Sequence, residues 1–141
     1  MNKEEATKFL ALIKIAYPKA YRNMDNDSII ATINMWHKTF SDVPYAIMEM
    51  ALDHFRRISE FEPTVASIFK ELRDLHYAAL EDVLTSRGEK KIKLALYVMS
   101  QTERFKEGAS RDYKINYEPL AMLDGANQGL FLEGGQEGVV I

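Results

Sequence analysis

The side chains that could take part in catalysis are few, and their spacing fits no common catalytic site. The chain of 141 residues has no cysteine, which excludes disulfides, thiolate metal sites and cysteine nucleophiles. Its three histidines, His37, His54 and His76, fall in separate predicted helices without the HExxH spacing of a zinc site. We expect His37 and His76 to lie near the core. Asp53 and His54 are adjacent on a predicted helix and face different directions, so they form no dyad by themselves.

The sequence also lacks the motif that usually binds phosphate. The Gly-Glu-Lys sequence at 88–90 has neither the preceding glycine nor the following hydroxyl of a phosphate-binding loop, so we expect no independent ATP hydrolysis. Paired carboxylates, such as Glu4 with Glu5 and Asp25 with Asp27, lie at predicted helix starts, where capping and the helix dipole explain them. The sequence therefore predicts a protein that is not an enzyme and that uses no cofactor and no metal.

Apolar residues up to about residue 106 recur every three or four positions, which is typical of amphipathic helices, and no strand-like alternation precedes residue 110. Asn2 and Glu5 predict a capping box for the first helix, which should end near Tyr17 because Pro18 follows. One of the residues 25–27 should cap the second helix. Ser41 or Asp42 should cap the third, with Pro44 in its first turn.

The stretch FEPTVASIFKEL, residues 61–72, contains the clearest helix start in the chain. Pro63 cannot extend the preceding helix, and the Thr64 hydroxyl can accept a hydrogen bond from an unpaired N–H group of the fourth helix. That helix should close at Gly88 in a left-handed conformation. A fifth helix is predicted from about Lys90 to Lys106.

These patterns predict an all-α fold, a small helical bundle of about four helices with a helical extension and a flexible C-terminal tail. We expect three parts: a helical N-terminal domain at 1–86, a basic helical extension at 87–107, and a flexible, acidic, glycine-rich tail at 108–141. Apolar residues that should share one face of the second helix are Ile29, Ile30, Ile33, Trp36, His37 and Phe40, with Trp36 in the core. The residues that define this predicted fold are Pro18, Trp36, Pro44, Pro63, Thr64 and Ile68.

Charge is distributed unevenly along the chain, whose net charge is −3. Residues 1–86 hold ten basic and thirteen acidic residues, residues 87–107 hold six and three, and residues 108–141 hold two and five. An acidic body without a basic recognition helix favours a protein partner over direct nucleic-acid binding. No apolar run reaches the roughly 20 residues of a membrane span. With the absence of cysteine, this predicts a cytoplasmic protein that contacts no membrane.

The basic stretch and the tail supply the residues that we expect to bind a partner. Tyr97 and Phe105 lie among the cations of the extension, and apolar islands in the tail can dock onto a core supplied by another protein. A solvated helix face and an uninvolved terminus are the alternative explanations. The expected partner-binding residues are Lys90, Lys91, Lys93, Tyr97, Arg104, Phe105, Lys106, Leu130, Phe131 and Leu132.

The segments FLALIKIAYPKAY and MWHKTFSDVPYAIMEMALDHFRRISEFEPTVASIFKEL resemble a family of phage-encoded loaders and inhibitors of replicative DNA helicases, over about residues 5–75. The resemblance implies a compact helical N-terminal domain and a C-terminal part that is largely unstructured alone and contacts the helicase. It also implies an adaptor that holds the hexameric helicase, restrains its ATPase and unwinding activity, and delivers it to an origin-bound initiator protein in the infected bacterial cell.

Two other functions remain open at this point. A DNA-binding replication or transcription regulator would use a helix-turn-helix within residues 27–58, although the acidic body disfavours it. A phage assembly protein would use the tail to dock in a virion oligomer. The leading hypothesis is the non-enzymatic replication adaptor.

Overall fold

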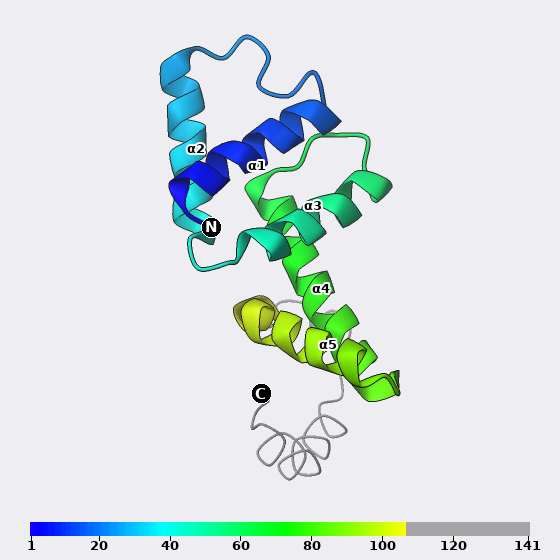
Figure 1. Ribbon diagram of the computed structural model, residues 1–141. Helices are drawn as coiled ribbons and strands as arrows, with labels where there is room; N and C mark the ends of the chain where they lie inside the picture. The colour runs from blue at the N-terminus through cyan, green and yellow to red at the C-terminus, as the bar shows by residue number, and fades with distance from the viewer. Residues whose placement is uncertain (107–141) are drawn as a thin grey trace. The chain divides into compact units, whose positions relative to one another are not determined.

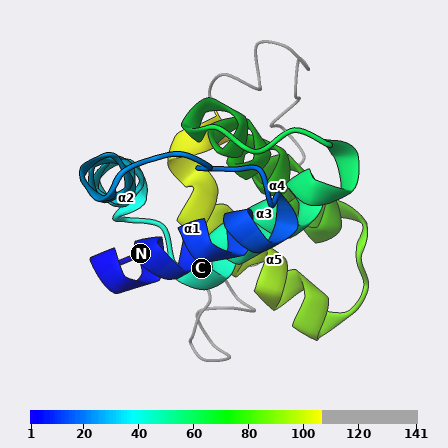
Figure 2. The same cartoon turned by 90° about the horizontal axis from the view of Figure 1, so that it is seen from above.

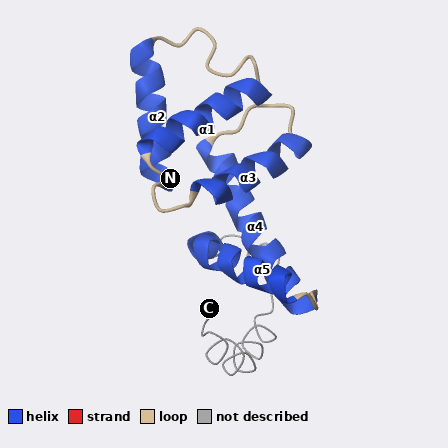
Figure 3. Ribbon diagram, viewed as in Figure 1, coloured by secondary structure: helices blue, strands red, loops and turns tan. Residues whose placement is uncertain are grey.

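The computed structural model describes residues 1–106, which form five α-helices and one short 3₁₀ helix (Figures 1 and 3). These residues contain no strand, so the predicted all-α fold is confirmed. The predicted tail at 108–141, with Leu130, Phe131 and Leu132, lies outside the described residues. In chain order the elements are α1 Lys3–Ala16, α2 Asn26–Phe40, α3 Tyr45–Ile58, α4 Val65–Thr85, α5 Glu89–Thr102 and η1 Glu103–Phe105.

The chain divides into two compact units, Met1–Leu72 and a second unit that begins at Arg73. The division falls inside α4, so this helix contributes its first turns to one unit and the rest to the other. The domain boundary after residue 86 stays a prediction. Each unit is described by itself below.

Most predicted helix ends are confirmed by hydrogen bonds. Asn2 and Glu5 form the capping box of α1, with both side-chain to backbone distances at 2.8 Å. The Asp25 carboxylate caps α2 by accepting a hydrogen bond from the Ser28 N–H at 2.8 Å. The Thr64 hydroxyl accepts from the Ser67 N–H at 3.1 Å, as expected for the start of α4. Short polar side chains thus fix the first turns of three helices.

Two helix ends differ from the predictions. Pro44 itself occupies the N-cap position of α3 and has no side-chain donor or acceptor, so neither Ser41 nor Asp42 is the capping residue. Gly88 has φ −86° and is the N-cap of α5, which means that the predicted left-handed conformation is wrong. The Ser86 hydroxyl accepts a hydrogen bond from the Gly88 N–H at 3.2 Å, and the chain enters α5 without a left-handed residue.

The core of the first unit is built around Trp36, which is 2 % exposed, as predicted. Its indole ring lies against Phe9 of α1, with ring centroids 5.4 Å apart, and against Phe40 of α2, at 5.6 Å. The turn of α4 inside this unit adds Ile68, which is fully buried. Figure 2 shows α1 running alongside α3, and α1 contacts both α2 and α3.

The predicted apolar face of α2 is wrong at Ile30, which is 55 % exposed, because α1 covers a narrower stripe of the helix than the sequence pattern implied. The other end of α2 meets the chain's first residue. The Met1 ammonium donates hydrogen bonds to the carbonyl oxygens of Phe40 at 3.1 Å, Ser41 at 3.2 Å and Val43. A positive charge at the C-terminal end of a helix complements the helix dipole. Within residues 1–106, no helix is both long and apolar enough to cross a bilayer.

Candidate protein-binding surface

Helix α5 packs against the second part of α4 through one face. The buried residues of that face are Ala95, Val98, Met99 and Thr102. The Thr102 hydroxyl lies 3.1 Å from Nδ1 of His76 on α4, and the Tyr77 hydroxyl donates a hydrogen bond to the carbonyl oxygen of Lys106. These contacts hold α5 in a defined position within the second unit. They also determine which of its other side chains are exposed.

The opposite face of α5 combines apolar and cationic side chains, and we call it the α5 outer face: Lys90, Lys93, Leu94 and Tyr97. Leu94 is 58 % exposed and Tyr97 is 47 % exposed. Lys90, Leu94 and Tyr97 follow one another at spacings of four and three residues, so they form a single stripe along the helix. Aromatic side chains such as Tyr97 are enriched at protein–protein interfaces, and lysines suit the polar rim around them.

The other predicted cations are engaged in local interactions. Lys93 lies 3.1 Å from Glu89, and Lys91 lies 3.4 Å from Asp82. Lys106 pairs with Glu103, and the Arg104 guanidinium lies 4.3 Å from the centroid of the Phe105 ring. All of these ion pairs are at least one third exposed at both ends. Pairs of this kind contribute only about 0–1 kcal/mol, so a partner carboxylate can replace the present one at little cost.

Phe105 lies in the core of the second unit and is 1 % exposed. Its expected role in partner binding needs an accessible ring, and the buried position gives it a packing role instead, because η1 turns the side chain inward. Leu94 has the exposure that was expected of Phe105, yet the set of expected partner-binding residues omits it. The sequence feature that could have identified Leu94 is its spacing from Lys90 and Tyr97, which places all three on one stripe of the helix.

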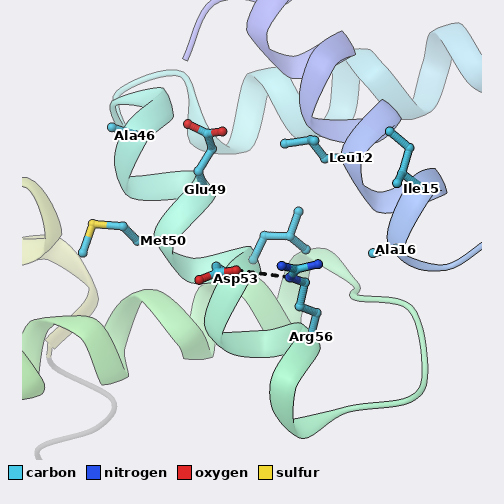
Figure 4. A pocket seen from close by; sticks show the side chains of 9 residues that line it. Leu12, Ile15, Ala16, Ala46, Glu49, Met50, Asp53 and Arg56 are labelled. Carbon is cyan, nitrogen blue, oxygen red and sulfur yellow. Dashed lines mark hydrogen bonds and ion pairs between the residues drawn. The ribbon is translucent and has the colours of Figure 1, made fainter.

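A second surface lies in the first unit, where α1 and α3 border an open groove of about 490 Å³. Figure 4 shows the side chains that line it, which come from both helices. The residues are Leu12, Ile15, Ala16, Ala46, Glu49, Met50, Leu52, Asp53 and Arg56, and we call this surface the α1–α3 groove. Ile15 is 77 % exposed and Met50 is 39 % exposed.

Burial is the largest cause of the pKa shifts of His76 and Tyr21. Burial lowers the pKa of His76 in the second unit; the nearby Glu103 carboxylate opposes this shift and Lys106 adds to it. In the first unit, burial and the Glu62 carboxylate together raise the pKa of Tyr21 to about 12. Among residues 1–106, no three His, Cys, Asp or Glu side chains lie close enough to hold a metal ion.

A comparison with known proteins bears on the first unit. Residues 1–69 match the family model of the N-terminal domain of a phage helicase loader and inhibitor. No curated protein and no solved structure matches the chain. The matched segment contains α1, α2, α3 and the first turn of α4, with the Trp36 core and the Pro63-Thr64 junction. The predicted resemblance to the phage-encoded loaders and inhibitors of replicative helicases is thus confirmed over residues 1–69.

Proposed function

We propose that this chain is a non-enzymatic adaptor of phage DNA replication that binds a hexameric replicative helicase through the α5 outer face and the apolar islands of the tail. The match of residues 1–69 to the N-terminal domain of a helicase loader and inhibitor is the single observation that carries this proposal. Because the resemblance implies that the part of the chain after the N-terminal domain contacts the helicase, we assign the contact to residues beyond the matched segment.

The α5 outer face has the composition that this role requires. Leu94 and Tyr97 offer apolar area, and Lys90 forms no hydrogen bond or ion pair with any residue that the structure describes. The positive charge of this stretch complements an acidic patch on a partner and directs its approach. Arg104 and Lys106 follow α5 in the chain, at η1 and its C-cap, and add two further cations to this stretch.

The adaptor restrains the helicase by binding one of its conformations more tightly than another. A ligand shifts a conformational equilibrium only by the difference between its affinities for the two states. Inhibition therefore requires that the adaptor disfavour the helicase state that is competent for ATP turnover or strand capture. Delivery requires that the origin-bound initiator or the DNA compete with the adaptor, which is a reciprocal coupling between binding sites.

Purified full-length protein, mixed with the phage or host replicative helicase, tests the proposal. We expect a complex at micromolar concentration and a lower ATPase rate. Leu94→Ser should weaken the complex at least fivefold, whereas the matched variant Leu84→Ser, at a leucine of α4 that is 41 % exposed, should not change it. Absence of a complex contradicts the adaptor proposal, and equal effects of the two variants move the contact away from α5.

Direct DNA binding is the alternative that the same protein sample tests. A helix-turn-helix within residues 27–58 would use α3, but its Arg56 and Arg57 both pair with Asp53 at 3.1 Å. Helix α3 holds two arginines and two carboxylates, Glu49 and Asp53, so it has no excess of basic over acidic side chains, which supports the adaptor over the regulator. Duplex DNA binding that weakens steeply with salt would reverse this preference.

A further inference from the structure

We propose that the face of α2 that points away from the core is a self-association surface, which binds the same face of a second copy of this chain about a two-fold axis, with the two helices antiparallel. We call this surface the α2 outer face: Asp27, Ile30, Ala31, Asn34, Met35 and Lys38. It belongs to the first unit and shares no residue with the α5 outer face. The inference does not rest on helicase binding.

Apolar side chains on the solvent side of α2 are the first observation that supports this surface. The six residues recur at i, i+3, i+4, i+7, i+8 and i+11, so they form one stripe along the helix, and all six are exposed. Ile30 is 55 % exposed and Met35 is 50 % exposed, whereas Trp36 and Phe40 on the opposite side are buried. Figures 1 and 2 both show α2 at the edge of the first unit, where no other helix described in that unit covers the stripe. Apolar side chains grouped on one exposed stripe are a mark of a protein-binding surface.

The charges at the two ends of the stripe select the partner. Asp27 lies in the first turn of α2 and Lys38 lies in its last turn, and His37 is the only other titratable side chain of this helix. Neither Asp27 nor Lys38 forms a hydrogen bond or ion pair with any residue that the structure describes. A stripe with one acidic end and one basic end complements its own copy when the two helices run antiparallel, because each carboxylate then faces an ammonium group.

One register accommodates the whole stripe. Residues that face each other across a two-fold axis between antiparallel helices share a midpoint in the sequence, and a midpoint between residues 32 and 33 serves all six residues of the α2 outer face. The facing pairs are then Asp27 with Lys38, Ile30 with Met35, and Ala31 with Asn34. Acid thus meets base, the two long apolar side chains meet each other, and the small Ala31 leaves room for the Asn34 amide near the axis. A shift of one helical turn would remove the ion pairs, so the charges favour this register.

The size of the contact sets the expected affinity. Helix α2 has 15 residues and a length of about 22 Å at 1.5 Å per residue, so two such helices bury less surface than a standard protein interface. Exposed ion pairs add little to affinity and mainly select the orientation of the partner. We therefore expect a reversible dimer with a dissociation constant in the micromolar range.

Sedimentation velocity of the full-length protein, over a concentration series through the micromolar range, tests the proposal. We expect a monomer that converts to a dimer as the concentration rises. Ile30→Glu should weaken the dimer at least tenfold. Ile15→Glu makes the same change on α1, at a residue that is 77 % exposed and outside the α2 outer face, and should leave the dissociation constant unchanged. Circular dichroism checks that each variant stays folded.

Charge reversal tests the antiparallel register. Asp27→Lys places ammonium groups at both ends of the stripe, and Lys38→Glu places carboxylates at both ends, so each variant alone should dimerise at least fivefold more weakly than the wild type. An equimolar mixture of the two variants should form a heterodimer with about the wild-type affinity, because every ammonium group of one copy then faces a carboxylate of the other. This recovery would also show that both variants are folded.

Four results would overturn the proposal. These are a monomer throughout the micromolar range, equal effects of the two isoleucine variants, single charge variants that dimerise as well as the wild type, and a mixture that dimerises no better than its components. Equal isoleucine effects would place the contact on another surface, and unweakened charge variants would contradict antiparallel pairing. A helicase complex that survives Ile30→Glu leaves the proposed function intact, and a dimer that forms no helicase complex contradicts only the proposed function.

Discussion

The His76 imidazole and the Thr102 hydroxyl, 3.1 Å apart and both buried, join α4 to α5 inside the second unit. The single proton of the Thr102 hydroxyl points to the Val98 carbonyl oxygen at 2.7 Å, so the hydroxyl oxygen accepts from Nδ1–H of His76. This arrangement satisfies both buried polar groups with the neutral imidazole. It also fixes the rotation of α5 that exposes Leu94 and Tyr97.

Acid should destabilise the second unit through His76. Burial holds the pKa of His76 below its usual 6.5, so the unfolded chain takes up a proton first as the pH falls below 6.5. Stability is therefore complete above about pH 6.5 and is lost as the pH falls toward the lower folded-state value. Urea unfolding followed by circular dichroism at about pH 7.5 and about pH 5 measures the loss. His76→Asn keeps a donor toward Thr102, and it should lose less stability over the same range than the wild type.

Removing the Thr102 hydroxyl should cost about 1–3 kcal/mol of unfolding free energy, because it removes the hydroxyl partner, 3.1 Å away, of the buried Nδ1 of His76. Thr102→Val makes this change at nearly constant volume. Thr102→Ser keeps the hydroxyl and removes one methyl group, and about 1 kcal/mol is expected from the smaller apolar burial. Urea titrations at about pH 7.5 compare the two. If serine is as damaging as valine, packing rather than the hydrogen bond holds α5.

The sequence predicted the helices and the N-terminal caps of α1, α2 and α4, because these depend on neighbours within one turn; the cap of α3 and the conformation of Gly88 were predicted wrongly. Asn2, Asp25 and Thr64 cap the helices as expected, and Trp36 is in the core. Ile30 and Phe105 show what helical spacing does not predict. Helical spacing identifies an apolar stripe but not its width, and the packed helix decides which edge of the stripe is covered, so Ile30 is exposed and Phe105 is buried.

The candidate surfaces were harder to predict from the sequence than the helices were. The α1–α3 groove brings together residues separated by more than thirty positions, and nothing local marks Ile15 as exposed. The burial of Glu71 and its pairing with another helix were not predicted for the same reason. Glu71 is a charged residue on the core side of α4, and its partner, His54, comes from α3. Pairings between helices follow from tertiary packing, which periodicity in one helix does not encode.

The His54–Glu71 pair gives a prediction for the first unit. The Glu71 side chain is 3 % exposed, its only partner among the described residues is His54, and the His54 side chain is 51 % exposed. His54→Ala should cost about 1–3 kcal/mol, since it leaves a buried carboxylate without its hydrogen bond. The double variant with Glu71→Met should recover part of that loss, because an apolar side chain of similar size has no charge to satisfy. A purely additive double-mutant cycle would contradict the coupling.

Trp36 allows the stability of the first unit to be followed on its own. It is the only tryptophan in the chain, it is 2 % exposed, and its indole ring contacts Phe9 and Phe40, so its fluorescence reports the unfolding of this unit. Phe9→Ala removes one ring from this cluster and should cost about 3–5 kcal/mol. Phe105→Ala removes an equally buried ring from the second unit. It should lower the urea midpoint seen by circular dichroism and move the fluorescence midpoint less than Phe9→Ala does, because the tryptophan lies in the other unit. Equal shifts of the fluorescence midpoint in both variants would show that the two units unfold as one.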